Sequence, residues 1–277
     1  GIANRCLFRR ECRIVLELHH DEVRLVLDPS NGGCVVSLTV DGLRLLRTPE
    51  DDPGGTHWGS FVMAPWAGRT RHGRFAFDGV EHQLEINFGD HSIHGTVRQR
   101  PWTVEDADPT RARMSCDFGP DWPFAGWAEQ VIVVHDDRVD LELSMHASDG
   151  PTPVVGGWHP WWQRQLDRGD PAELELPAAS MYVRDAEGIA VPDKVAPPPG
   201  PWDDCFTDLT GSPVLRWPGA FELAIESDCP CVVVYDEPAE AICVEPQSGP
   251  PDALNHDPAV AEPGHPLVIH SSWRFRT

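Results

Sequence analysis

The sequence predicts an all-β protein built as a large antiparallel β-sandwich, and three observations carry this prediction. Short runs in which apolar and polar residues alternate, or in which β-branched residues dominate, recur from one end of the chain to the other. The chain holds 28 prolines and 24 glycines, which separate these runs as turn residues. No apolar stripe with helical spacing persists for a dozen residues. We therefore expect antiparallel sheets stacked face to face, because stacking buries strand edges better than one open sheet does.

Each of these runs has the length of a strand. In chain order, the predicted strands lie within residues 13–20, 22–28, 34–42, 73–79, 80–86, 112–118, 129–147, 172–177, 221–227, 231–237, 241–246 and 267–275. The clearest is a hairpin from about Gln130 to His146, because apolar residues alternate on both arms around Asp136 and Asp137. Pro-rich tracts near 191–203 and 246–266 are too short for domain linkers and are expected to be loops. We expect the whole chain, 1–277, to be one domain.

The charge of the chain limits its partners. It carries 22 basic against 44 acidic residues, a formal net charge of −22, which repels phosphate backbones and anionic lipids. We expect no nucleic-acid partner and no membrane partner. No run reaches the roughly 20 apolar residues that span a bilayer, and the first residues lack the apolar core of a secretory signal. Eight cysteines without a CxxC pair indicate reduced thiols, so the expected location is cytoplasmic.

The sequence lacks the usual signatures of several enzyme classes. The patterns GxGxxG, GxxxxGK[ST], HExxH and GxSxG are absent, which argues against dinucleotide binding, P-loop phosphotransfer, zincin proteolysis and serine hydrolysis. Lys194 is the only lysine and lies in a Pro-rich segment. Schiff-base catalysis would have to depend on that one residue.

Four segments combine polar and aromatic residues in ways that strand packing does not require: APWAGRTRHGRFAFDG (64–79), HSIHGTVRQRPW (91–102), GGWHPWW (156–162) and VEPQSGPPDALN (244–255). In the first, Arg69 precedes a predicted strand and either points its guanidinium at substrate oxygens or pairs with a surface carboxylate. In the second, Gly95 lets another backbone approach His94 closely. His91 and His94 lack a third ligand at metal spacing, so no metal is expected, and His94 either binds a ligand or has a structural role.

His159 lies among three tryptophans in GGWHPWW. Pro160 restricts it to extended backbone, so the imidazole belongs to a strand end or a loop. The surrounding indoles favour the neutral ring and lower its pKa, and we expect this ring to exchange protons near neutral pH. The alternative is a core corner in which the tryptophans merely pack.

Glu245 follows the apolar run AICV and precedes a proline. Partial burial at such a position raises the basicity of a carboxylate, which makes Glu245 a candidate general base or, alternatively, one more surface acid. Gln247 and Asp252 are candidates for bonding sugar hydroxyls or for capping the turn.

The order of these motifs resembles the aldose 1-epimerase family, the galactose mutarotases, over roughly residues 20–275. The resemblance rests on Arg69, then GRFAFDG, HG with a nearby PW, WHPWW, a DxxF segment and ExQ near the C-terminus. It implies a β-supersandwich with a groove that binds a hexose, with His159 as general acid and Glu245 as general base. By position it also assigns substrate contacts to Arg69, His94 and Asp203. The chain departs from the family pattern at Gly68 and Thr96, which bears on sugar preference.

The resemblance implies cofactor-independent anomer interconversion through ring opening and reclosure, with no metal. It places the acid and the base on different sides of one sugar. Gln247 would contact hydroxyl groups, and Trp161, with Trp66 and Trp162, would offer flat apolar faces to the small-molecule sugar.

Two other functions stay open. Arg69, Arg71, Arg74, Arg98 and Arg100 lie close together in the sequence, which is compatible with a hexose 6-phosphate 1-epimerase. A non-catalytic carbohydrate-binding sandwich is the other alternative, although binding alone does not require an acid and base pair. A monomer or a homodimer is expected.

Overall fold

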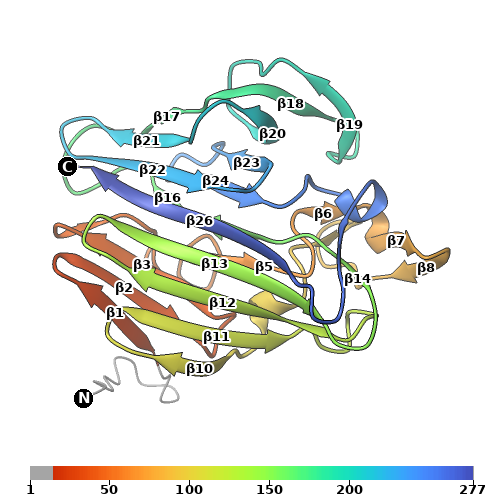
Figure 1. Cartoon of the computed structure of the whole chain (residues 1–277). Helices are drawn as coiled ribbons and strands as arrows, with labels where there is room; N and C mark the ends of the chain where they lie inside the picture. The colour runs from red at the N-terminus through yellow and green to blue at the C-terminus, as the bar shows by residue number, and fades with distance from the viewer. Residues whose placement is uncertain (1–14, 277) are drawn as a thin grey trace.

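Two stacked antiparallel sheets dominate the structure, a computed structural model that describes residues 15–276. The larger, 12-stranded sheet runs in the order β1 (Leu16–His20), β2 (Val23–Asp28), β3 (Cys34–Val40), β5 (Ser60–Met63), β15 (Gly157–Pro160), β24 (Ala241–Gln247), β23 (Cys231–Tyr235), β20 (Asp203–Leu209), β18 (Ala178–Arg184) and β19 (Ala190–Val195), with β4 (Leu43–Arg44) beside β3 and β16 (Trp162–Gln163) beside β24. The predicted sandwich is confirmed (Figure 1).

The second sheet has eight strands. Its order is β10 (Thr103–Ala107), β11 (Arg111–Asp117), β12 (Gly126–Val134), β13 (Arg138–Ala147), β26 (Leu267–Arg276), β22 (Phe221–Ser227), β21 (Val214–Trp217) and β17 (Glu173–Glu175). The predicted hairpin is β12 and β13, which pair from Gly126 opposite Ala147 to Val134 opposite Val139. Buried and half-buried residues alternate along β12, as the sequence pattern requires.

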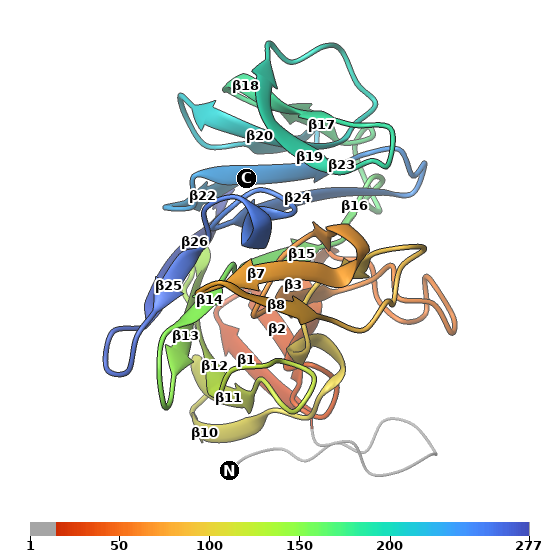
Figure 2. The same ribbon diagram turned by 90° about the vertical axis from the view of Figure 1, so that its right-hand side faces the viewer.

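Short elements complete the chain. Three two-stranded ribbons pair β6 (Arg69–Thr70) with β9 (Ser92–Ile93), β7 (Arg74–Phe77) with β8 (Val80–Gln83), and β14 (Thr152–Val154) with β25 (Ala259–Ala261). The described helices are the 3-10 turns η1 (Arg71–Gly73), η2 (Val97–Gln99) and η3 (Ala253–Asn255). The β7–β8 hairpin projects from one side of the sandwich (Figures 1 and 2). No helix in residues 15–276 has the length and apolar composition needed to cross a membrane.

The prediction that both Pro-rich tracts are loops is wrong in part. β19 occupies the start of the first tract, while the end of β24, η3 and β25 lie in the second. These strands are short, and their prolines obscure the alternation that marks longer strands.

The cysteines of the described residues include five buried free thiols: Cys116, Cys205, Cys229, Cys231 and Cys243. Cys6 and Cys12 lie outside the described residues.

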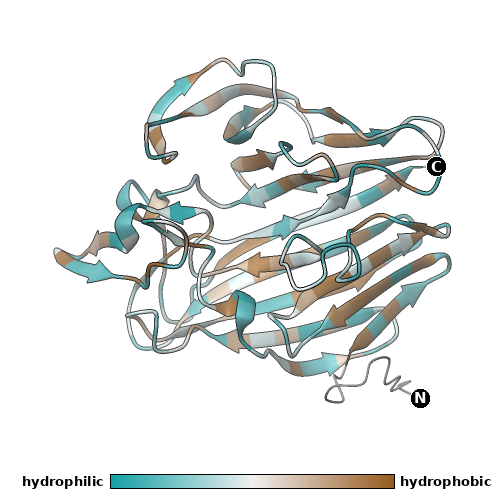
Figure 3. Cartoon of the chain, turned by 180° about the vertical axis from the view of Figure 1, so that it is seen from behind, coloured by the Kyte–Doolittle hydropathy of each residue, from teal (hydrophilic) through white to brown (hydrophobic). Residues whose placement is uncertain are grey.

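The core lies between the two sheets. Leu25 and Leu38 of the larger sheet and Ile132 and Leu143 of the smaller one belong to a single cluster of buried residues. Apolar residues alternate with paler or polar ones along the strands (Figure 3), so each sheet has one face turned to this core. The other face of the larger sheet is available for a site.

Strand β15 carries a functional candidate at the centre of the larger sheet, between β5 and β24. A Cβ added to Gly157 would lie 2.6 Å from the carbonyl oxygen of Pro246, so only glycine allows the two strands this approach. Trp158 points into the core, where its Nε1 donates to Gln130 Oε1 of β12 at 3.1 Å. Because side chains alternate along a strand, the next residue, His159, faces the opposite side.

Candidate active site

The outer face of the larger sheet forms the floor of a cavity of about 780 Å³. His159 on β15 lies opposite Phe61 on β5, and Glu245 on β24 lies opposite Val233 on β23. Gly157 pairs with Gln247 in an antiparallel register, which places His159 beside Glu245. Seven residues proposed from the sequence line this cavity: Arg69, His94, His159, Trp161, Asp203, Glu245 and Gln247.

His159 and Glu245 are in direct contact. The imidazole Nε2 lies 3.3 Å from the carboxylate Oε1, and the two residues are only 7% and 2% exposed. The expectation that acid and base face each other across a sugar is therefore wrong, because the register of β15 and β24 sets them side by side. A proton can pass between them without a relay.

Burial moves the pKa values of this pair in opposite directions. It lowers the pKa of His159 to about 3, with further lowering by the positive charge of Arg98 and by His57. It raises the pKa of Glu245 well above its usual range, and the nearby Asp203 charge adds to this. Burial thus favours a neutral imidazole at His159 and disfavours the charged form of Glu245, so without a ligand His159 does not readily hold the proton expected of it near neutral pH. The sequence predicted the direction of the His159 shift but could not place the Arg98 charge.

Aromatic rings stack along the cavity floor. Phe61 stacks on His159 with ring centroids 4.7 Å apart, His159 on Trp161 at 5.0 Å, and Trp161 on His57 at 4.5 Å. Trp161 is 4% exposed and stacks on both His57 and His159, so it does not offer the open flat face that was expected. Trp162 is wrong as a sugar platform, since it is fully buried and packs against Trp273 in the core.

Trp66, the third tryptophan expected to face a sugar, lines the cavity but is 3% exposed. Its ring stacks on Trp122 with centroids 5.5 Å apart. Like Trp161, it offers the cavity little open face.

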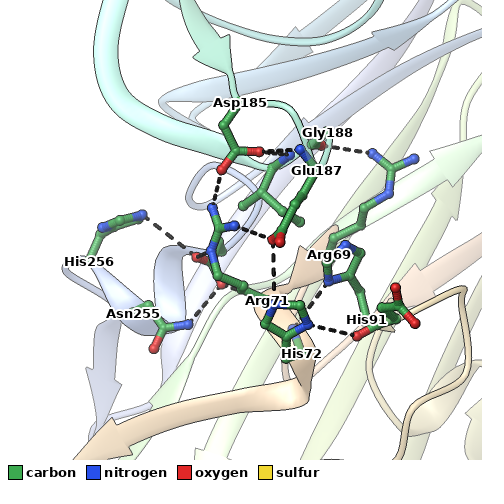
Figure 4. A network of polar contacts seen from close by, with 12 residues as sticks. Arg69, Arg71, His72, His91, Asp185, Glu187, Gly188, Asn255 and His256 are labelled. Atoms are coloured by element: carbon green, nitrogen blue, oxygen red, sulfur yellow. Dashed lines mark hydrogen bonds and ion pairs between the residues drawn. The ribbon is translucent and has the colours of Figure 1, made fainter.

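Arg69 and Asp203 bind each other at the cavity wall. Arg69 Nη2 lies 3.2 Å from Asp203 Oδ2, and Arg69 Nη1 donates to the carbonyl of Gly188 at 3.2 Å. Asp203 also accepts from Arg184 at 3.0 Å. Figure 4 shows Arg69 reaching toward Gly188, next to the ion pairs of Arg71 with Asp185 and Glu187. The guanidinium of Arg69 is thus oriented, and much of its charge is compensated.

His94 adopts an unusual backbone at the edge of the cavity. Its φ is 63°, in the left-handed region that non-glycine residues seldom occupy, and its N–H donates to the carbonyl of Gly68. The close approach expected at Gly95 is confirmed, since a Cβ there would lie 2.0 Å from the carbonyl oxygen of Ala64. The His94 ring meets the His159 ring edge-on at 5.2 Å. Burial lowers the pKa of His94 well below its usual range, with His159 and Arg98 adding to this, so its ring is neutral.

Several buried polar atoms of the cavity wall have no hydrogen-bond partner within residues 15–276. Native proteins seldom leave such groups unpaired without a role. The unpaired atoms include both hydrogen-bond donors and acceptors. The hydroxyl groups of a sugar can both donate and accept, so they suit such a wall. The set of unpaired atoms comprises Trp66 Nε1, Ser92 Oγ, His94 Nδ1, Thr96 Oγ1, Arg100 Nε, His159 Nδ1, Trp161 Nε1 and Gln247 Oε1.

His91 and Asp252 have structural partners instead. His91 Nδ1 accepts from the backbone N–H of His72, and Asp252 accepts from the backbone of Arg71 and from Asn255. Neither lines the cavity. For Asp252, the turn-capping alternative is the one the contacts support.

Cys243 lies beside His159 and Glu245, and it was not predicted from the sequence. Cys243, Glu245 and Gln247 are spaced by two along β24, so a strand places all three on one face, and this spacing was the available signal. One donor atom from each of His159, Cys243 and Glu245 lies within 4.8 Å of the others. Nitrogen, sulfur and carboxylate oxygen are the ligands that Zn²⁺ prefers.

Comparisons with known proteins agree on one family. The aldose 1-epimerase family model matches residues 15–273. The uncharacterized protein YihR of Escherichia coli K12 is 27% identical over 268 residues, 85% of each chain. Galactose 1-epimerase of Lactobacillus acidophilus has a TM-score of 0.81 at 17% identity, covering 98% of this chain and 97% of that one. The GalM/aldose epimerase homologue of C. elegans has a TM-score of 0.81 at 18% identity, covering 95% and 98%. At such identities the solved structures bear on the fold.

Proposed function

The chain belongs to the aldose 1-epimerase family, and from that premise we propose that it interconverts the α and β anomers of an aldose, with residues 1–277 acting as one domain. The observation that carries the proposal is the 3.3 Å contact between His159 and Glu245. Two buried groups with opposite pKa shifts lie beside unpaired polar atoms in a cavity large enough for a sugar.

The proposed reaction moves one proton onto the sugar and one off it. Glu245, ionised, takes the proton of the anomeric hydroxyl, whose O–H electrons form the carbonyl as the bond from C1 to the ring oxygen breaks. His159, protonated, gives its proton to the departing ring oxygen. The aldehyde then rotates about the C1–C2 bond, and the ring oxygen attacks the other carbonyl face with both transfers reversed.

The pair carries one proton throughout this cycle. Ring opening converts Glu245 carboxylate and His159 imidazolium into a protonated carboxyl and a neutral imidazole, which is the state favoured by burial. Direct contact lets the proton return from Glu245 to His159 when a sugar binds. Under this proposal Arg69, His94, Asp203 and Gln247 bind sugar hydroxyls, Trp161 donates from its indole edge, and no cofactor takes part.

Polarimetry of freshly dissolved α-anomers tests the activity. We expect the wild-type protein to speed the relaxation of at least one aldose in a panel of neutral and anionic hexoses and pentoses. His159→Gln should lower this rate by about 10²-fold or more, because a positioned proton donor is lost. His270→Ala is the matched control, since His270 is exposed on β26 and does not line the cavity. A wild-type rate equal to that of buffer for every sugar would refute the proposal.

Zinc should inhibit the enzyme by capturing the catalytic pair. We expect micromolar Zn²⁺ to abolish anomer exchange and EDTA to restore it, because His159, Cys243 and Glu245 offer three donor atoms in one place. Cys243→Ser should weaken the inhibition at least about tenfold, because it removes a direct ligand. The inhibition constant is measured from polarimetric rates relative to the uninhibited rate of each variant. Equal inhibition of both proteins would show that zinc binds elsewhere.

A further inference from the structure

Arg98 is a cation without a counter-ion in the cavity wall. It lies on η2 and lines the cavity, and its guanidinium carbon stands 4.9 Å from the ring centre of Phe61. Within residues 15–276 its guanidinium makes no ion pair and no hydrogen bond. Contact with an aromatic face attracts a cation but leaves its N–H donors unused. Burying a charge in this way is costly, so an unpaired guanidinium in a cavity calls for a ligand.

Three of the other four arginines that suggested an anionic substrate are engaged or lie elsewhere. Arg69 and Arg184 share Asp203, and Arg71 is held by Asp185 and Glu187. Arg74 bonds Gln83 and does not line the cavity. Arg100 also lines the cavity and makes no ion pair within residues 15–276, but its side chain bonds Cys116 and its Nε is buried. Arg98 and its neighbour Arg100 therefore keep an uncompensated charge at the cavity, and Arg98 is the one that lies over Phe61 on the floor.

Acidic residues also line the cavity, but they do not neutralise Arg98. Asp203 and Asp204 are paired with Arg184. Three other carboxylates of the lining have no ion pair within residues 15–276, but they are exposed, so water screens them: Glu85, Asp121 and Glu237.

The order of groups along the floor indicates which end of a sugar meets Arg98. Glu245, His159 and Phe61 lie on three successive strands, about 4.8 Å apart, with Arg98 over Phe61. In a pyranose, the anomeric carbon is bonded to the ring oxygen, the ring oxygen to C5, and C5 to C6. With the anomeric hydroxyl at Glu245 and the ring oxygen at His159, the C6 group extends toward Arg98.

We propose that Arg98 binds an anionic group at the C6 end of the substrate, so that the preferred substrates are hexoses carrying a carboxylate or a phosphate there. The inference rests on the proposed function for the orientation of the sugar. A guanidinium suits this task, because its planar fork binds carboxylate and phosphate oxygens in pairs.

Electrostatics support the assignment. The charge of Arg98 lowers the pKa of both His159 and His94. An anion bound to Arg98 offsets that charge and so favours a proton on His159 when substrate is present. A bound anionic substrate would thus favour the protonated form of His159, the acid that opens the sugar ring.

Calorimetry with methyl glycosides separates binding from turnover, because these sugars cannot open. We expect methyl glucuronide or methyl glucoside 6-phosphate to bind wild-type protein about 10- to 100-fold more tightly than methyl glucoside. The two anions distinguish a carboxylate site from a phosphate site. Arg98→Gln should remove the preference, Arg98→Lys should restore part of it, and Arg74→Gln should leave it intact. Equal affinity for charged and uncharged glycosides, or a preference that survives Arg98→Gln, would overturn the proposal.

Polarimetry completes the test. The ratio of kcat/KM for glucuronate or glucose 6-phosphate to that for glucose should fall about 10- to 100-fold in Arg98→Gln. An equal loss for charged and neutral sugars would assign Arg98 a merely structural role. If no aldose is turned over while anionic glycosides bind through Arg98, the proposed function fails and the anion site stands.

Discussion

Glu245→Gln is expected to lower kcat/KM for anomer exchange by about 10²- to 10⁴-fold, because the amide cannot take the anomeric proton. The fold should survive, since glutamine has the size of glutamate and its amide can still bond both neighbours, His159 Nε2 and Gln247. Rates come from polarimetry and folding from circular dichroism. Retention of more than about a tenth of the wild-type rate in the folded variant would exclude Glu245 as the base.

The same variant should change how stability depends on pH. Burial raises the pKa of Glu245 above its unfolded value, so its stabilising effect is complete below the unfolded pKa, about 4.3, and is lost as pH rises through the folded pKa. Glutamine does not ionise and escapes this loss. The melting temperature of Glu245→Gln relative to wild type should therefore increase as pH rises above about 4.3 and then level off. A difference that stays constant between pH 4 and 9 would show that Glu245 is not desolvated.

Trp158→Ala is expected to lower the free energy of unfolding by about 3–5 kcal/mol. The ring is fully enclosed between the sheets directly behind His159, and its loss leaves a cavity and removes the donor to Gln130. Trp158→Phe keeps most of the packing and should cost about 1–3 kcal/mol for the unpaired Gln130 oxygen. Urea unfolding, followed by circular dichroism, measures both changes.

Trp127→Ala provides the comparison for this substitution. Trp127 is half-buried on the outer face of β12, where it stacks on His146. Its removal should cost about 1 kcal/mol, since it opens no enclosed cavity. If Trp158→Ala were no more costly than Trp127→Ala, the core between the sheets would not hold β15 in place.

Long alternating strands were predictable because their pattern is local. The arms of the β12–β13 hairpin follow directly from residues that alternate between core and solvent. The extended backbone expected at His159 is confirmed, but β15 was not predicted as a central strand, since Gly157 and Pro160 both disfavour one. The structure accommodates them by pairing β15 with β24 only at Gly157 and Gln247, while β15 pairs with β5 along its length.

The proposed acid, base and polar contacts do line the cavity, but their arrangement was not predictable. His159 and Glu245 are 86 positions apart in the sequence, and only the strand register brings them within 3.3 Å. The indoles of WHPWW correctly indicated a lowered pKa for His159, whereas the contribution of Arg98 depends on a turn from a distant segment. Trp161 illustrates the same limit, because sequence cannot show that His57 and His159 pack against its ring.

The most direct test of the central claim, that His159 and Glu245 act as one proton-exchanging unit, is the polarimetric rate of a double-variant cycle. Wild type, His159→Gln, Glu245→Gln and the double variant are compared on the best substrate of the panel. We predict that each single variant loses most of the activity and that the double variant is little slower than the slower single one. Losses that multiply, or single variants that match wild type, would contradict a shared proton in this pair.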